Sequence, residues 1–235
     1  MRLTTATALW MMRCLRMLLG ATLFVLIAIP HTAAEQSDVN AIYKRFGELF
    51  EAGNYSAALV EAERNEAGIK ARFGVDHPNY GDALHWRAMV YEAQGLYADA
   101  ESLFKRSLAI REKALGRDHP DVATSLNNLA LLYQAQGRYA DAEPLYKRGL
   151  AIREKALGRD HPDVAQSLNN LAALYDWQSR YADAEPLLQR SLAIREKALG
   201  PNHPYVAQSL NNLADLYRNQ GRYADAEPIR SRRRR

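Results

Sequence analysis

The sequence predicts an all-α protein made of stacked helix pairs, and three recurrences carry this prediction. The dipeptide His-Pro occurs at 77–78, 119–120, 161–162 and 203–204, each time 42 residues after the last. The hexapeptide Ser-Leu-Asn-Asn-Leu-Ala recurs with the same step at 125–130, 167–172 and 209–214. A glycine keeps the step at 74, 116, 158 and 200. Self-similarity at a fixed period of this length is the signature of a repeat architecture, in which one supersecondary unit is copied.

The first helix of each unit is best seen in residues 119–160. Its apolar stripe runs at i, i+3, i+4 and i+7, through Leu126, Leu129, Ala130 and Tyr133. This spacing places the four side chains on one face of a helix. Pro120 has a backbone pre-set for the first helical position, and Gly137 is expected to end the helix.

A second helix is expected from near Ala140, and Gly158 is expected to end it. Its stripe is Ala142, Leu145, Tyr146, Gly149, Ile152 and Ala156. The small residues Ala142 and Gly149 let the two helices approach closely. One such pair cannot bury its own stripe, so neighbouring pairs must stack on it.

The repeat divides the chain into seven segments. They are a signal peptide over 1–34, a diverged first repeat over 35–76, complete repeats 2, 3 and 4 over 77–118, 119–160 and 161–202, an incomplete repeat 5 over 203–229, and a basic tail over 230–235.

Individual copies depart from the pattern. Repeat 1, with helices expected near 40–52 and 55–73, lacks the paired asparagines. In repeat 2, Arg87 stands where repeat 3 has Leu129. The apolar packing that the leucine makes is therefore not expected at that position. In repeat 4, Ser179 replaces the glycine that ends the first helix.

The N-terminus has the features of a secretory signal. Arginines precede an apolar run from Met17 to Ile29, and Ala34 precedes an expected cleavage point at Glu35. The run is shorter than the roughly 20 residues of a membrane span. Because the only cysteine, Cys14, lies in this segment, the mature chain would have no disulfide. We expect export to a bacterial periplasm or exterior. The alternative is an uncleaved segment that anchors the protein in the inner membrane.

The formal charge of +4 is set by the two ends of the chain. Eight arginines, namely Arg2, Arg13, Arg16, Arg230 and Arg232 to Arg235, lie outside residues 35–229. Subtracting them from 31 Lys+Arg leaves 23 basic residues against 27 acidic ones, a net charge of −4. The repeats are therefore mildly acidic, and no nucleic-acid partner is expected.

The unit resembles the tetratricopeptide repeat (TPR) in Leu126, Leu129, Ala130, Tyr133, Gly137, Tyr139, Ala142 and Tyr146. Its period of 42 residues and the stretch AEPLYKRGLAIREKALGRDHPDVA resemble the kinesin-light-chain-like subclass. The resemblance covers about residues 38–230. It implies a right-handed α-solenoid of about five helix-turn-helix repeats, whose first helices line a concave face. It also implies a protein or peptide partner.

The paired asparagines are the first candidate binding residues. A primary amide both donates and accepts hydrogen bonds, so a row of amides suits the backbone of an extended peptide. The better candidates are Asn127, Asn169 and Asn211, and the others are Asn128, Asn170 and Asn212. The structural alternative is that these amides tie adjacent repeats, or their His-Pro loops, together.

Specificity would come from first-helix positions that vary between copies. They are Asp82, His85, Trp86, Met89, Glu92, Thr124, Leu131, Gln134, Gln166, Ala173, Asp176, Trp177, Asp215 and Arg218. The tryptophans Trp86 and Trp177 are candidate anchors for a peptide, since tryptophan is enriched among residues that dominate binding. Tryptophans in the seams between repeats are the alternative.

No catalytic, metal or cofactor site is expected. The histidines His77, His119, His161 and His203 occur once per repeat, too far apart to share a metal ion and well placed to start helices. The sequence has no nucleophile or phosphate-loop motif. We therefore expect a non-enzymatic scaffold that binds a protein segment in its concave groove. The alternatives are an assembly element that self-associates through its incomplete C-terminal repeat, and a membrane-tethered adaptor.

Overall fold

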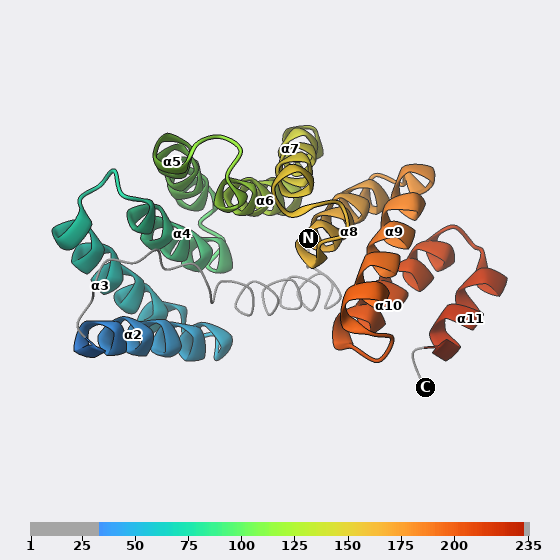
Figure 1. Ribbon diagram of the computed structural model, residues 1–235, viewed down its shortest axis with the longest axis horizontal. Coiled ribbons are helices and arrows are strands. Elements are labelled where there is room, and N and C mark those ends of the chain that lie inside the picture. The colour runs from blue at the N-terminus through green and yellow to red at the C-terminus, as the bar shows by residue number, and fades with distance from the viewer. Residues whose placement is uncertain (1–32, 233–235) are drawn as a thin grey trace. The chain divides into compact units, whose positions relative to one another are not determined.

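The computed structural model describes residues 33–232, where ten helices and no strand form the secondary structure (Figure 1). The helices are α2 (Ala33–Glu51), α3 (Tyr55–Phe73), α4 (Pro78–Ala93), α5 (Tyr97–Leu115), α6 (Pro120–Ala135), α7 (Tyr139–Leu157), α8 (Pro162–Trp177), α9 (Tyr181–Leu199), α10 (Pro204–Asn219) and α11 (Tyr223–Arg232). The predicted all-α solenoid of helix pairs is confirmed.

Two predictions lie largely outside the described residues. Residues 1–32 hold nearly all of the expected signal peptide, and residues 233–235 hold the end of the basic tail. Both stay predictions. Among the helices of residues 33–232, none combines the length and the hydropathy that crossing a membrane requires.

The chain divides into two compact units, residues 1–65 and 66–235. In the described part of the first unit, aromatic rings join α2 to the start of α3. The rings of Phe46 and Phe50 stack with centroids 5.7 Å apart, and the ring of Phe50 meets that of Tyr55 edge-on at 5.4 Å. Ala58 and Ala62 are fully buried.

In the second unit, α4, α6, α8 and α10 each pack on the second helix of their own repeat, and α6, α8 and α10 also pack on the second helix of the repeat before. In repeat 4, Val164, Ala165 and Leu168 of α8 form one apolar cluster with Ile194 of α9, and Leu150 of α7 packs against it. Repeats 2 and 3 have equivalent clusters. The core is therefore a row of small clusters, each shared between neighbouring repeats.

The His-Pro dipeptides start the first helices, as predicted. His161 is the N-cap of α8, and its Nδ1 accepts a hydrogen bond from the backbone N–H of Asp163 at 3.2 Å. The following proline takes the first helical position, where its missing N–H leaves no hydrogen bond unmade. The other three histidines, His77, His119 and His203, make the same cap.

The predicted close approach at Gly149 is confirmed. A Cβ atom at this residue of α7 would lie 3.3 Å from the carbonyl oxygen of Ala123 on α6. In repeats 2 and 4 the equivalent residues are serines. The Ser107 hydroxyl donates to the carbonyl of Gly81 at 2.7 Å, and that of Ser191 donates to the carbonyl of Ala165 at 2.8 Å.

Arg87 is accommodated by polar partners. Its Nη1 lies 2.6 Å from Glu66 Oε2, and its Nη2 donates to the Tyr91 hydroxyl at 3.0 Å. Glu66 also accepts a hydrogen bond from the Tyr80 hydroxyl at 2.8 Å. A polar cluster thus replaces the leucine contact of repeat 3.

Ser179 is strained, and Ser179→Gly is expected to raise the free energy of unfolding by about 0.5–1 kcal/mol. Its φ is +57°, and it is the only non-glycine residue with a positive φ in residues 33–232. The equivalent residue Gly137 has a φ of +73°. A side chain in this left-handed region costs about 1 kcal/mol, partly offset by the greater freedom of glycine in the unfolded chain. Urea denaturation followed by circular dichroism measures the effect. Gly137→Ser, the reverse change one repeat earlier, should destabilise, and equal signs for both variants would contradict the prediction.

Candidate binding face

The variable positions form one stripe along each first helix of the second unit, which we call the first-helix stripe. Its residues follow one another at intervals of three, four and three, so they share one face of the helix. They are Asp82, His85, Met89 and Glu92 in α4, Thr124, Asn127, Leu131 and Gln134 in α6, Gln166, Asn169, Ala173 and Asp176 in α8, and Gln208, Asn211, Asp215 and Arg218 in α10.

Four of the predicted site residues join neighbouring repeats. The amide nitrogen of Asn170 donates to Asn127 Oδ1 at 2.7 Å, and both side chains are buried. The amide nitrogen of Asn128 lies 3.4 Å from both ring nitrogens of His85, which are also buried. Each contact links the first helices of adjacent repeats. The structure therefore places these amides in the seams, as the structural alternative requires.

The remaining asparagines differ between repeats 4 and 5. Asn169 is buried, and with its amide oxygen facing α9 it accepts hydrogen bonds from Arg195 Nη1 at 2.9 Å and from Ser191 Oγ at 3.0 Å. Asn211 and Asn212 are only half-buried. A role of the asparagines in binding a peptide stays a prediction, and these two are the most accessible for it.

The aromatic candidates lie in different environments. The ring of His85 packs on that of Phe104, with centroids 5.3 Å apart. Burial and the nearby charge of Arg111 lower the pKa of His85 to about 3, so its ring is neutral at pH 7. Trp86 is half-buried in repeat 2. Trp177, two repeats later at the end of α8, is 48% exposed. Trp177 is thus the more exposed of the two tryptophans, and its role as an anchor for a peptide stays a prediction.

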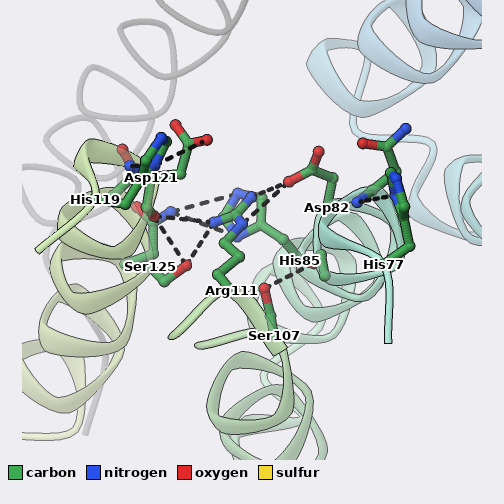
Figure 2. Close-up of polar contacts among 12 residues, drawn as sticks. His77, Asp82, His85, Ser107, Arg111, His119, Asp121 and Ser125 are labelled. Atoms are coloured by element: carbon green, nitrogen blue, oxygen red, sulfur yellow. Dashed lines mark hydrogen bonds and ion pairs between the residues drawn. The ribbon is translucent and has the colours of Figure 1, made fainter. Parts of the chain in front are cut away.

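A set of arginines, two of them buried and one half-buried, holds the stripe together, and sequence reasoning missed it. Arg111 of α5 reaches between two first helices, where its guanidinium bonds to Asp82 of α4 and to Ser125 of α6 (Figure 2). Its Nε donates to Asp82 Oδ1 at 3.1 Å. The side chain of His85 lies beside this cluster in Figure 2.

Arg153 and Arg195 repeat this arrangement with uncharged partners. Arg153 donates to Thr124 Oγ1 at 3.2 Å and to Ser167 Oγ at 2.9 Å. Arg195 donates to Gln166 of α8 at 2.8 Å and to Ser209 of α10 at 2.9 Å. Burial lowers the pKa of Arg195 to about 10, still far enough above 7 to keep the guanidinium charged. These arginines fix the spacing between successive first helices.

A second series of bonds fixes the opposite end of the first helices. Glu143 of α7 accepts from the Tyr175 hydroxyl at 3.1 Å and from Arg180 Nη1 at 2.8 Å, both in the next repeat. The ammonium of Lys147 and the guanidinium of Arg180 hold the pKa of Glu143 below its ordinary value. Glu101 and Glu185 make the same pair of bonds to their next repeats.

No metal centre is formed by the residues that the structure describes. Each capping histidine uses Nδ1 to accept a backbone N–H. Histidine, cysteine and acidic side chains of the described residues nowhere gather in a group of three suited to a metal ion.

Asn127→Ala is expected to lower the free energy of unfolding by about 1–2 kcal/mol. The substitution removes the acceptor of the buried Asn170 amide, and a buried donor without a partner costs about that much. The urea midpoint of the variant measures the loss. Asn202→Ala, in an exposed turn, serves as the control. A double-mutant cycle with Asn170→Ala should show coupling between the two sites, and additive losses would rule out the bond as the cause.

Comparison with protein families gives a match to the tetratricopeptide repeat model over residues 79–155, 121–197 and 163–229. No protein of curated function matches the sequence. Each matched segment takes in consecutive helix pairs of the second unit.

Solved structures share this architecture. A chain from Podosopora anserina, described as a kinesin light chain with nearly identical TPR-like repeats, is 28% identical, with a TM-score of 0.69 over 84% of this chain and 94% of that one. BtubC (BKLC) from P. vanneervenii is 22% identical, with a TM-score of 0.72 over 83% of this chain and 78% of that one. This second likeness shows the fold alone. Such solenoids are typical of protein-interaction scaffolds. The chain belongs to the tetratricopeptide repeat family.

Proposed function

We propose that the second unit is a scaffold that binds an extended segment of another protein along the first-helix stripe. One observation carries the proposal. The packing positions are nearly the same in repeats 3 and 4, whereas stripe positions change from Leu131 to Ala173 and from Gln134 to Asp176. Residues that only pack repeats together need not change chemistry in this way, whereas residues that select a ligand do.

The seams make the stripe a rigid surface. Amide bonds, buried arginines and the glutamate pairs hold successive first helices in one register. A surface fixed before binding loses little conformational freedom when a ligand is bound. We therefore assign the central asparagines of repeats 3 and 4 to support of the stripe. Ligand contact is assigned to the more open stripe positions Thr124, Leu131 and Ala173, and to Trp177, which follows the stripe residue Asp176 in the sequence.

Trp177→Ala is expected to weaken binding of peptides by about tenfold or more, because a tryptophan at a binding face commonly contributes more than 1 kcal/mol. Linear peptides selected for the parent protein from a phage-displayed library supply the ligands. Fluorescence anisotropy then compares their affinity for the parent and for the variant.

Tyr223→Ala provides the matched control. It removes an aromatic side chain that is 68% exposed and lies on α11, the second helix of repeat 5, away from the first helices. It should leave the affinity unchanged. Failure to select any peptide, or peptides that depend on Tyr223 and not on Trp177, would contradict the proposed function.

A further inference from the structure

The arginines between successive first helices differ in how their charge is neutralised. At the junction of repeats 2 and 3, Arg111 is paired with a carboxylate, because Asp82 of α4 accepts from its Nε and its Nη2 (Figure 2). At the next junction, Thr124 of α6 stands at the stripe position that Asp82 occupies in repeat 2, and its hydroxyl is uncharged. The guanidinium of Arg153 therefore has no carboxylate at the place where Arg111 has one.

The bonds that Arg153 makes leave part of its donor capacity unused. Its Nη1 donates to Ser167 Oγ at 2.9 Å and to the Asp163 carbonyl at 3.3 Å, and its Nη2 donates to Thr124 Oγ1 at 3.2 Å. Its Nε has no acceptor among the described residues. An arginine binds a carboxylate most strongly through two parallel N–H groups. Nε and the second hydrogen of Nη2 can still donate to such a group.

The positive charge of Arg153 has no counter-charge in contact with it. An arginine side chain stays protonated in proteins. The carboxylate of Asp163 acts on Arg153 only from a distance and forms no ion pair with it. Burial lowers the pKa of Arg153, and the negative charge of Asp163 offsets this only in part. A carboxylate would therefore bind this half-buried guanidinium more strongly than an exposed cation, because less water screens the pair.

The place beside Arg153 can be reached from the stripe. In repeat 2 the side chain of Asp82 is 40% exposed while it is paired, so a carboxylate at this position lies open to solvent. The junction of repeats 4 and 5 is different. There Arg195 is only 2% exposed, and the amide oxygens of Gln166 and Gln208 accept from it. Of the three junction arginines, Arg153 alone combines accessibility with an unpaired charge among the described residues.

We propose that the segment bound along the stripe carries an aspartate or glutamate whose carboxylate lies over Thr124 and accepts from Nε and Nη2 of Arg153. This inference rests on the proposed function. The protein supplies the template, because Asp82 makes this pair with Arg111 from within the chain. The stripe position of Asp82 and Thr124 thus decides whether a junction is closed from within or left for a ligand.

The peptides selected from the phage-displayed library test the inference by fluorescence anisotropy at about 0.15 M salt. Each labelled peptide is compared with a version in which its acidic residue is replaced by the matching amide. The parent should bind the acidic version about tenfold more tightly, as expected for a hydrogen-bonded charge pair. Thr124→Asp should lose this preference, because its own carboxylate pairs with Arg153. The isosteric variant Thr124→Asn should keep the preference. Asn202→Asp adds the same charge in an exposed turn and should bind like the parent.

A measurement without peptide tests the same site. Thr124→Asp should have a higher urea midpoint than Thr124→Asn, since its carboxylate neutralises Arg153. The difference should shrink below about pH 4, where aspartate becomes protonated. Equal midpoints at pH 7 would show that Arg153 accepts no carboxylate and would overturn the inference.

Selected peptides that lack an acidic residue, or a preference lost equally in Thr124→Asp and Thr124→Asn, would also overturn the inference. Circular dichroism checks that each variant is folded. If those peptides still require Trp177, the inference fails and the proposed function stands. If no peptide is selected, both fail.

Discussion

Replacing Arg195 by methionine is expected to lower the free energy of unfolding by about 3 kcal/mol, the largest effect that we predict. The side chain is 2% exposed, and its Nη1 donates to the Tyr205 carbonyl at 3.0 Å, to Gln208 Oε1 at 3.1 Å and to Ser209 Oγ at 2.9 Å. Methionine fills a similar volume but leaves these acceptors, of which Ser209 is fully buried, without the guanidinium donor. Removing one partner of a buried polar network costs several kcal/mol.

Urea denaturation followed by circular dichroism measures this loss, with Arg159→Met as the matched control. Arg159 lies 36 residues earlier in a turn, and its side chain is 78% exposed. Its ion pair with Glu154 is long, at 3.9 Å, and solvent-exposed on the arginine side, so its loss should change the midpoint little. A control variant as unstable as Arg195→Met would show that the buried bonds are not the cause.

Glu92→Gln is expected to stabilise the protein above pH 7 by about 2 kcal/mol and to leave its stability unchanged near pH 4. Burial raises the pKa of Glu92 from 4.5 to about 7 in the folded state. Folding therefore favours the protonated carboxyl, and the parent loses stability as the pH rises from about 4.5 to about 7. Glutamine stays neutral throughout. The full shift corresponds to about 3 kcal/mol, which we reduce because water reaches a half-buried carboxylate.

Urea midpoints at several pH values test this prediction. Glu143→Gln is the control with the opposite sign, because the pKa of Glu143 is lowered by its cationic partners. That variant should be less stable than the parent at pH 7, with the difference shrinking as the pH falls below 4.5. A constant stabilisation by Glu92→Gln across this range would mean that ionisation is not involved.

The fold was predictable because the repeat fixes helix starts and stops several times over. The expected first helix from Pro120 to Gly137 corresponds to α6, Pro120–Ala135, followed by its C-cap at Gln136. The second helix, expected near Ala140, begins at Tyr139. The prediction for repeat 1 was less accurate. Its first helix was expected near 40–52, whereas α2 spans Ala33–Glu51, and no His-Pro dipeptide precedes it to mark a start.

The site was predictable only in part. Asn127 and Asn128 recur together, so periodicity could not tell whether their amides face a groove or bond to the neighbouring repeat. The answer depends on partners 43 residues away. Nothing in the sequence marks Arg195 as buried, because an arginine on an amphipathic helix is usually solvated. Its burial follows from polar partners on two other helices, which no local pattern reveals.

The bonds between repeats have one further consequence, for how such a chain lengthens in evolution. The tyrosine-to-glutamate bond spans 32 residues and the arginine-to-glutamate bond 37 residues at each of three successive junctions. Each repeat therefore carries both halves of the interface, one for the repeat before it and one for the repeat after it. An in-frame duplication of a single repeat creates a matching neighbour at once, without any compensating mutation. Later substitutions can then accumulate on the open positions of the new copy while its junctions stay intact.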